Sequence, residues 1–279
     1  MNKFPVLLLS LIILFGLCFG TVAGESSKTD SQESYLKIKS LFKIKAKFND
    51  YTIENGTKVW NNVVFELNPT NSKIYSEVKL PKSSIKKTIV IYPIFTAAAY
   101  SDGGFYDYYK GKCDKSCLQV DISKNYPSKF SSSGNAAQVL KLLGYKFVND
   151  IDVDKEPSIL SKYDRVILLH NEYVTKKEYT AIVNHPNVIY LYPNALYAEV
   201  SVNYEKNKMN LVRGHNYPTS QILNGFSWKY DNSNLEYDTQ CSKMGFDRIP
   251  NGWMLNCYPE TAIHASKNLL KILRNIGFD

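Results

Sequence analysis

The chain has 279 residues, of which 44% are hydrophobic and 13% aromatic, enough for one large domain or for one domain with a small appendage. Its net charge is +8 at pH 7, with the lysines spread along the chain instead of gathered in one cluster. This pattern argues against a nucleic-acid-binding module, and it leaves an anionic cell surface as a partner that the charge would attract.

The first 23 residues have the pattern of a secretory signal peptide. Lys3 precedes an apolar run from Val6 to Leu17, and Thr21-Val22-Ala23 supplies the small residues of a cleavage site. The run is shorter than the ~20 apolar residues that a membrane-spanning helix needs. We therefore expect a secreted or cell-surface protein, with an N-terminal membrane anchor as the alternative. Residues 24–34 are small, polar and charged, and they predict a linker.

Residues 35–86 predict a small, antiparallel β-rich section. Apolar residues alternate with lysines between Leu36 and Phe48, and further strand-like runs follow. Two turn signals, Asn55-Gly56 and Asn68-Pro69, separate these runs. The expected later strands are 59–60, 63–67 and 74–80.

From residue 87 to 279, strand patterns alternate with helix patterns. The strands are continuous apolar runs, as in buried parallel strands. The expected strands are 88–95, 146–148, 165–170 and 187–192, and the expected helices are 134–143, one capped by Thr175, and 261–276. Such alternation predicts an α/β domain with a mostly parallel sheet and helices on both faces.

Four cysteines remain after Cys18 is removed with the signal, and an even count in an exported chain implies disulfides. Four cysteines allow three pairings. We favour Cys113–Cys117 and Cys241–Cys257, because each pair closes a short loop. Metal binding is the alternative, but a histidine partner is missing near the first pair.

Polar residues follow three of the expected strands, where parallel sheets bind their ligands. The three segments are 99–106, 170–173 and 193–197. In the second, His170 and Glu172 could serve as base and metal ligand, or as base and orienting acid. The local alternative is that Glu172 favours a helix dipole and His170 closes the end of the sheet.

The stretch 164–199 resembles the C-terminal region of the large subunit of N,N-dimethylformamidase. That family has a strand ending in H-x-E-Y, then a helix, then a strand leading to an Asn-containing turn. Upstream, AAAYSDGGFY resembles the family's Y-N-x-x-G-G-x-x-x-Y loop, and downstream MGFDRIP resembles its G-x-E-x-D-R segment. The resemblance covers residues 87–250 and implies a fold similar to class I glutamine amidotransferases, which is flavodoxin-like in layout.

The resemblance also implies a site. Amidohydrolases of this family hold one iron ion with two tyrosinates and one glutamate. Carried over by motif, Glu172 is the carboxylate ligand and His170 the acid/base residue beside it. Tyr100 and Tyr106 match the tyrosine ligands best, with Tyr108 and Tyr109 as rivals. Hard phenolate and carboxylate oxygens suit ferric iron, which would activate water and polarise an amide carbonyl.

Three positions depart from the family pattern. Phe246 stands where the family has its catalytic Glu, Ser101 replaces the Asn of the upstream loop, and Tyr192-Pro193 replaces a glycine pair. The first loss matters most, because a general acid/base contributes ~10²–10⁴-fold to a rate. Asp247 and Glu260 are the carboxylates that could substitute.

The remaining candidates are few. Tyr173 and Asn194 follow buried strands and are further site candidates, and His215 could reach the site from a loop. We expect His185 at the surface and His264 in the last helix. No cysteine follows a buried strand, which excludes glutaminase chemistry.

Three functions are consistent with these patterns. The leading expectation is metal-dependent hydrolysis of a small amide or related C–N bond. The alternatives are a catalytically degenerate relative that binds a ligand or an envelope component, and a structural surface protein. The sequence does not predict an oligomeric state.

Overall fold

The computed structural model describes residues 33–54, 57–85, 87–122 and 133–278. The expected signal peptide, most of the expected linker and the Asn55-Gly56 turn lie outside these ranges. The linker was expected to reach residue 34, but Glu33 and Ser34 already belong to a strand. Within the described ranges, the helices are all too short or too polar to cross a membrane.

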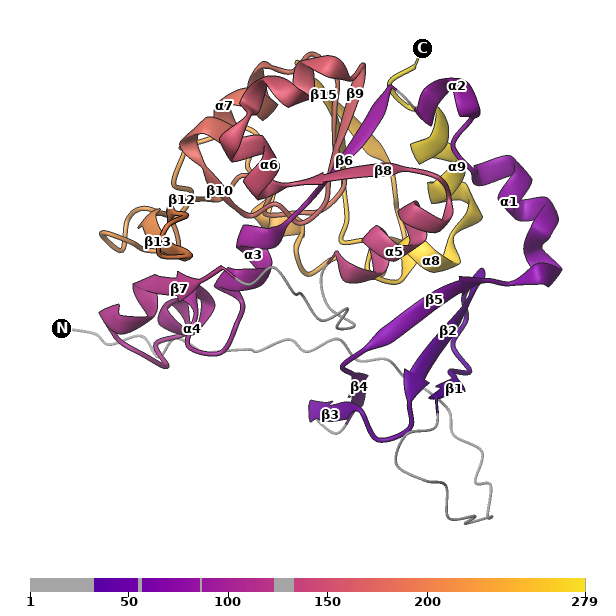
Figure 1. Ribbon diagram of the computed structural model, residues 1–279, viewed down its shortest axis with the longest axis horizontal. Helices are drawn as coiled ribbons and strands as arrows, with labels where there is room; N and C mark the ends of the chain where they lie inside the picture. The colour runs from indigo at the N-terminus through magenta and orange to yellow at the C-terminus, as the bar shows by residue number, and fades with distance from the viewer. Residues whose placement is uncertain (1–32, 55–56, 86, 123–132, 279) are drawn as a thin grey trace.

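A six-stranded sheet forms the centre of the protein, in the order β14-β15-β11-β9-β6-β8 (Figure 1). Its strands are β6 (Thr88–Tyr92), β8 (Lys146–Asn149), β9 (Arg165–Leu168), β11 (Val188–Tyr190), β14 (Phe246–Ile249) and β15 (Gly252–Leu255). Five strands run parallel, and β14 pairs antiparallel with β15 at one edge. The predicted mostly parallel α/β sheet is therefore confirmed, and β6, β9 and β11 end side by side.

Alternate residues of the strands face two separate cores. Val90, Ile167 and Ile189 pack with α5, α9 and the N-terminal section. Their neighbours in sequence, such as Ile89 and Val166, pack with α6 and α7 on the opposite face. Figure 1 shows α6 and α7 on one side of the sheet and α5, α8 and α9 on the other. Helices thus cover both faces, as a buried parallel sheet requires.

The helices of the described residues outnumber the three that the sequence predicted. They are α1 (Ser72–Val78), α2 (Lys82–Ile85), α3 (Ile94–Ala99), α4 (Phe105–Tyr109), α5 (Gly134–Leu142), α6 (Asp150–Lys155), α7 (Lys176–Asn184), α8 (Ala262–Ala265) and α9 (Lys267–Asn275), with 3-10 turns at Pro69–Asn71, Lys115–Leu118, Pro157–Lys162 and Ser233–Leu235. The expected strand 74–80 is wrong, because Asn68 caps a helical turn that continues into α1.

The expected helix 261–276 is two helices. Ser266 has extended backbone and its side chain accepts a hydrogen bond from the Leu269 amide, so it ends α8 and caps α9. The expected strand 88–95 also ends early. Pro93 has no N–H to donate to a ladder, and α3 begins at the next residue. Thr175 does cap α7, as predicted.

The N-terminal section is a small antiparallel sheet joined firmly to the main domain. It comprises β1 (Glu33–Tyr35), β2 (Phe42–Lys47) and β5 (Val63–Leu67), with a separate pair, β3 (Tyr51–Glu54) and β4 (Thr57–Trp60). Alternate residues of β2 are buried, as the lysine alternation predicted. The amide of Leu41 donates to the carbonyl of His264 in α8 (2.8 Å), and Gln138 of α5 accepts from the Phe65 amide (3.0 Å).

A further four-stranded sheet, absent from the sequence-based expectation, continues from the carboxyl ends of the central strands. Its strands, in the order β10-β12-β13-β7, are β7 (Gln119–Asp121), β10 (Tyr173–Thr175), β12 (Ala198–Asn203) and β13 (Lys208–Arg213). The chain enters β10 shortly after β9 and enters β12 shortly after β11. This sheet therefore stands over the edge at which the sequence placed the site.

Both predicted disulfides are present. Cys113 pairs with Cys117 in the loop after α4, and Cys241 pairs with Cys257 just beyond β15. The second bridge ties the long segment between β13 and β14 to the carboxyl end of the central sheet.

Candidate functional site

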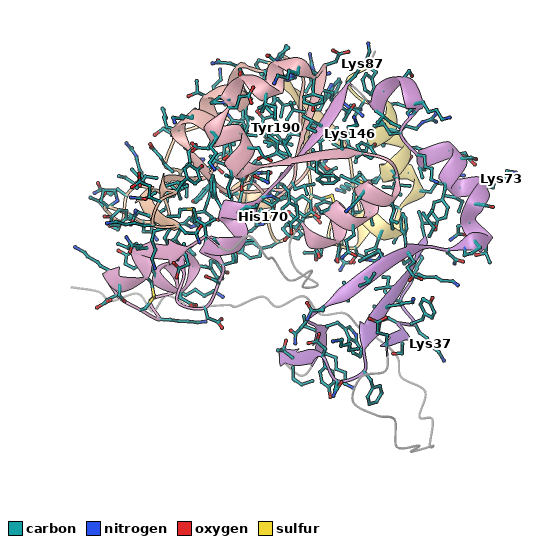
Figure 2. All side chains as sticks on the ribbon, in the orientation of Figure 1. Lys37, Lys73, Lys87, Lys146, His170 and Tyr190 are labelled. Carbon is teal, nitrogen blue, oxygen red and sulfur yellow. A yellow bond between two sulfur atoms is a disulfide. The ribbon has the colours of Figure 1, made fainter. Side chains whose placement is uncertain are left out.

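The segment that follows β9 is held rigidly by neighbours from other parts of the chain. The Asn171 side chain accepts from the Leu169 amide (3.1 Å). The His170 amide donates to Ser133 Oγ (2.7 Å), and the Glu172 amide donates to Thr96 Oγ1 in α3 (3.0 Å). Figure 2 shows His170 where α3 meets the central sheet. The backbone thus fixes where the His170 and Glu172 side chains begin.

Glu172 is a fully buried carboxylate with partners on both oxygens. The Tyr100 hydroxyl donates to Oε2 (2.8 Å), and His215 Nε2 lies 2.6 Å from Oε1. His170 Nε2 lies 3.5 Å from Oε2. Burial by itself would raise the pKa of Glu172, but the histidines and the Tyr100 hydroxyl outweigh it and hold that pKa below its ordinary value. Glu172 is therefore ionised at neutral pH, while burial lowers the pKa of His170.

His215 lies in the turn after β13, and the preceding glycine allows this turn to pass close to the neighbouring strand. Gly214 has φ +120°, and a Cβ on it would lie 2.9 Å from the Cα of Ala198. Only glycine fits so close to the neighbouring strand. The His215 ring stacks on Tyr173 (5.2 Å between ring centroids) and touches Tyr197 (4.7 Å) and Tyr109 (5.0 Å). The structure therefore confirms the expectation that His215 could reach the site, because its ring contacts Glu172.

Tyr100 ends α3 and carries its hydroxyl into the site. Its ring stacks on Tyr106 of α4, with 4.5 Å between centroids. Gly104 allows the tight return between the two helices, because a Cβ there would lie 2.4 Å from the Ala99 carbonyl oxygen. Part of the Tyr100 residue is exposed, but its hydroxyl end is enclosed. Burial, and then the charge of Glu172, raises the pKa of Tyr100 well above its ordinary value, so this phenol keeps its proton at neutral pH.

Tyr108 and Tyr109, the alternatives to Tyr100 and Tyr106 as site residues, lie in different surroundings. Tyr109 stacks on Tyr106 and meets His215, so it also lines the site. Tyr108 packs edge-on against Tyr217 instead.

Two further candidates carry buried polar atoms without a hydrogen-bond partner among the described residues. One is the Tyr173 hydroxyl, and the other is Oδ1 of Asn194. Asn194 has φ +56°, a conformation that Asn tolerates better than most residues. Because unpaired buried polar atoms are costly, both atoms mark places where a ligand or water would be bound.

Sequence reasoning missed Glu236, which follows the 3-10 turn Ser233–Leu235. The Asn194 amide group donates to Glu236 Oε2. Burial raises the pKa of Tyr106 and Tyr109 most, and the charge of Glu236 raises each further, by more than Glu172 does. Glu236 thus lies close to these two tyrosines. The only sequence signal was its nearness to Cys241.

The two carboxylates proposed as substitutes at position 246 differ in position: Glu260 lies near Tyr192, whose ring packs on His170, whereas Asp247 lies on an edge strand. Phe246 pairs with Leu255 and packs on the core shared with α5. Asp247 is exposed on edge strand β14, so the structure does not bring it to Glu172. Glu260 is buried and accepts from the Asn135 side chain (2.7 Å), and burial raises its pKa to about 7.

The two remaining histidines are buried, which corrects the surface expectation for His185. Its Nε2 lies 3.0 Å from the Tyr163 carbonyl oxygen, behind the amino ends of the strands. His264 packs against Phe65, with 5.6 Å between ring centroids.

A metal ion at Glu172 would need oxygen ligands from the tyrosines around it. Among the described residues, His, Cys, Asp and Glu side chains do not gather in groups of three arranged to hold a metal ion. An ion here would therefore depend on phenol oxygens, and Tyr100 already places one 2.8 Å from Glu172. Carboxylate and phenol oxygens are of the kind that ferric iron prefers, and Tyr106 is held beside Tyr100 by the stacking of their rings.

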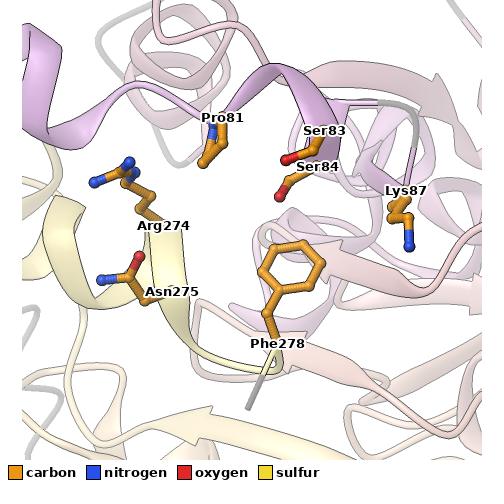
Figure 3. Close-up of a pocket in the computed structure, with 7 residues that line it drawn as sticks. All are labelled: Pro81, Ser83, Ser84, Lys87, Arg274, Asn275 and Phe278. Carbon is orange, nitrogen blue, oxygen red and sulfur yellow. The ribbon is translucent and has the colours of Figure 1, made fainter.

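Two cavities in the described part of the chain lie far from this site. The larger, of about 490 Å³, is lined by Pro81, Ser83, Ser84, Lys87, Arg274, Asn275 and Phe278 (Figure 3). The smaller, of about 290 Å³, includes Pro186, Asn187 and Trp253. Lys87 precedes β6 and Asn187 precedes β11, so both cavities open at the amino ends of the parallel strands.

Comparison with known proteins gave no family. No family model matches the sequence, and no curated protein matches it significantly. The resemblance to the dimethylformamidase large subunit therefore rests on its motifs alone.

Proposed function

We propose that this protein hydrolyses the C–N bond of a small amide at the Glu172 centre. The observation that carries the proposal is the convergence of Glu172, Tyr100, His170 and His215 at the carboxyl edge of a parallel sheet. A wholly buried, ionised carboxylate is costly, and proteins retain such groups mainly where they bind or react. The order of the three sequence motifs supports an amide as the substrate.

Tyr100, Tyr106 and Glu172 are the residues that would hold an iron ion in this proposal. When bound, the ion would supply Lewis acidity toward the amide carbonyl. His170 lies beside Glu172 and can exchange a proton with a bound water or substrate. His215 donates to Glu172 and fixes its orientation.

The test combines metal content with amide turnover. We expect the purified protein to hold about one iron per chain and to release amine from at least one of a panel of formamides and acetamides, followed by NMR. Glu172→Gln should lose both metal and turnover, whereas Glu205→Gln, on the exposed turn between β12 and β13, should keep both. Wild-type protein that holds no metal and cleaves no amide would overturn the proposal.

A degenerate, ligand-binding relative is the second candidate. The observation in its favour is Phe246, which packs into the core where the related sequences carry a catalytic glutamate. In that case the protein would keep its metal and release no amine.

We also propose that the protein is exported through the N-terminal signal peptide and acts outside the cell. The two disulfides support this, because such bonds persist in oxidising compartments. Removal of Lys3 with the signal peptide leaves a net charge of 8 − 1 = +7, which would favour contact with an anionic envelope.

A further inference from the structure

We propose that Glu236 is a catalytic carboxylate of this site, taking a proton from the attacking water and delivering it to the leaving nitrogen. This inference rests on the proposed amide hydrolysis. In it, Glu236 takes the acid/base role of the family glutamate that Phe246 replaces. Glu236 comes from the segment between β13 and β14, outside the motifs that carry the family resemblance.

The first support is the hydrogen bond from Asn194. Asn194 belongs to the turn after β11, and this turn is bonded to the segment that carries Glu172. The Leu196 amide donates to the Asn171 carbonyl (2.9 Å), and the Tyr197 amide donates to the Glu172 carbonyl (2.9 Å). Asn194 therefore holds the Glu236 carboxylate at a fixed place relative to Glu172.

The second support is the way the Glu236 segment is fastened. Cys241 is bonded to Cys257, two residues beyond β15. The Tyr258 amide donates to the Asp238 carbonyl (2.9 Å), and the Tyr258 ring packs against His170, with 6.0 Å between centroids. A loop tied at these points keeps its carboxylate over the carboxyl edge of the sheet.

The third support is the set of side chains that both carboxylates reach. The charges of Glu172 and Glu236 both act on His170, Tyr106, Tyr109 and Tyr197. These four side chains therefore lie near both carboxylates. The unpaired Oδ1 of Asn194 and the unpaired Tyr173 hydroxyl are buried in the same region. A substrate amide would offer the N–H and C=O groups that these atoms lack.

The proposed step balances without another reactant. The water oxygen bonds to the carbonyl carbon while one water proton passes to Glu236. The C–N bond then breaks, and the same proton passes from Glu236 to the nitrogen. The products are a carboxylic acid and an amine, and Glu236 returns to its starting form. The Glu236 carboxylate also accepts a hydrogen bond from Tyr237, the neighbouring residue in its own segment.

The test is kinetic and includes a binding control. Glu236→Gln keeps an acceptor for Asn194 and cannot take a proton, so kcat should fall by about 10²–10⁴-fold with KM changed by less than about threefold. Iron content should stay at the wild-type value, which separates this variant from Glu172→Gln. Glu236→Ala should regain part of its rate when formate is added, whereas the exposed control Glu205→Gln should behave as wild type.

The outcomes distinguish the two proposals. An active wild-type enzyme whose Glu236→Gln variant keeps kcat within twofold would overturn the role of Glu236 and leave amide hydrolysis standing. Loss of iron in Glu236→Gln would also overturn it, because Glu236 would then act through the metal site. A wild-type protein with no amide turnover would remove both proposals.

Discussion

At the scale of single residues, the site is built around one buried charge. Glu172 is removed from water, and its two oxygens are compensated by Tyr100 and His215. Such a carboxylate is stable only while its partners stay in place. The residues that position the partners therefore matter as much as the partners, and Gly214, beside His215, is one of these.

We predict that Gly214→Ala lowers the free energy of unfolding by at least about 1 kcal/mol more than Gly111→Ala. Both glycines have positive φ, +120° and +68°, so both variants are strained. Only at Gly214 would the new methyl group meet another strand, 2.9 Å from the Ala198 Cα. Urea denaturation, monitored by tryptophan fluorescence, measures the difference. Equal losses of unfolding free energy in the two variants would mean that β12 shifts to make room for the methyl group.

At the scale of elements, the long segment between β13 and β14 depends on a covalent tie. It has little regular structure apart from the turn Ser233–Leu235, yet it carries Glu236. The Cys241–Cys257 bond spans 16 residues of sequence, whereas Cys113–Cys117 spans four. Cross-linking the longer loop restricts the unfolded chain more.

We predict that Cys241→Ser with Cys257→Ser lowers the free energy of unfolding by about 3 kcal/mol, against about 2 kcal/mol for Cys113→Ser with Cys117→Ser. The first pair should also lower amide turnover, because the segment carrying Glu236 loses its fastening. The second pair should leave turnover close to wild type. Chemical denaturation and amine release measure the two effects, and an unchanged rate in the first pair would mean that hydrogen bonds alone hold the segment.

The elements that sequence could predict are those whose signal is local. Buried strands such as β9 and β11 are apolar runs, and the carboxyl-edge rule then places Glu172 and Tyr100 together, as the structure does. The sheet β10-β12-β13-β7 was missed, because its outer strands β10 and β7 have three residues each, and β7 pairs with β13, where Gln119 and Asn210 are 91 residues apart. Glu236 was missed because its position depends on the Cys241–Cys257 bond and on Asn194, and no pattern in the residues around Glu236 indicates these contacts.

At the scale of the whole molecule, several buried acids make stability depend on pH. Burial raises the pKa of Glu260 from 4.5 to about 7, and burial also raises that of Asp150. A carboxyl with a raised folded-state pKa stabilises the protein below its unfolded pKa, and this contribution is lost as pH rises through the folded pKa. Burial lowers the pKa of His264 from 6.5 to about 4, which acts in the opposite direction and fades above about pH 7.

We predict that the free energy of unfolding falls by about 1–2 kcal/mol between pH 6.5 and 8. At pH 6.5 about half of the unfolded chains still carry a protonated His264, which opposes the carboxyls by only ~0.4 kcal/mol across this window, so the buried carboxyls decide the sign. Glu260→Gln should flatten the slope by about 0.8 kcal/mol over the same range. Urea titrations at closely spaced pH values test this, with the exposed variant Glu205→Gln as the control. A free energy of unfolding that rises toward pH 8 would contradict the prediction, because it would mean that the pKa values of these carboxyls are not raised in the folded protein.

The contact between the N-terminal sheet and α8 has a consequence for the order in which the protein is made. Ser40 Oγ donates to the His264 carbonyl, 224 residues further along the chain. At the usual 5–20 residues per second of synthesis, the partner of this early segment appears about 11–45 s after the segment itself. Strand β15, which lies between β11 and β14, is equally late. The N-terminal sheet can therefore pack on α5 midway through synthesis, but its contact with α8 is completed only when almost the whole chain exists.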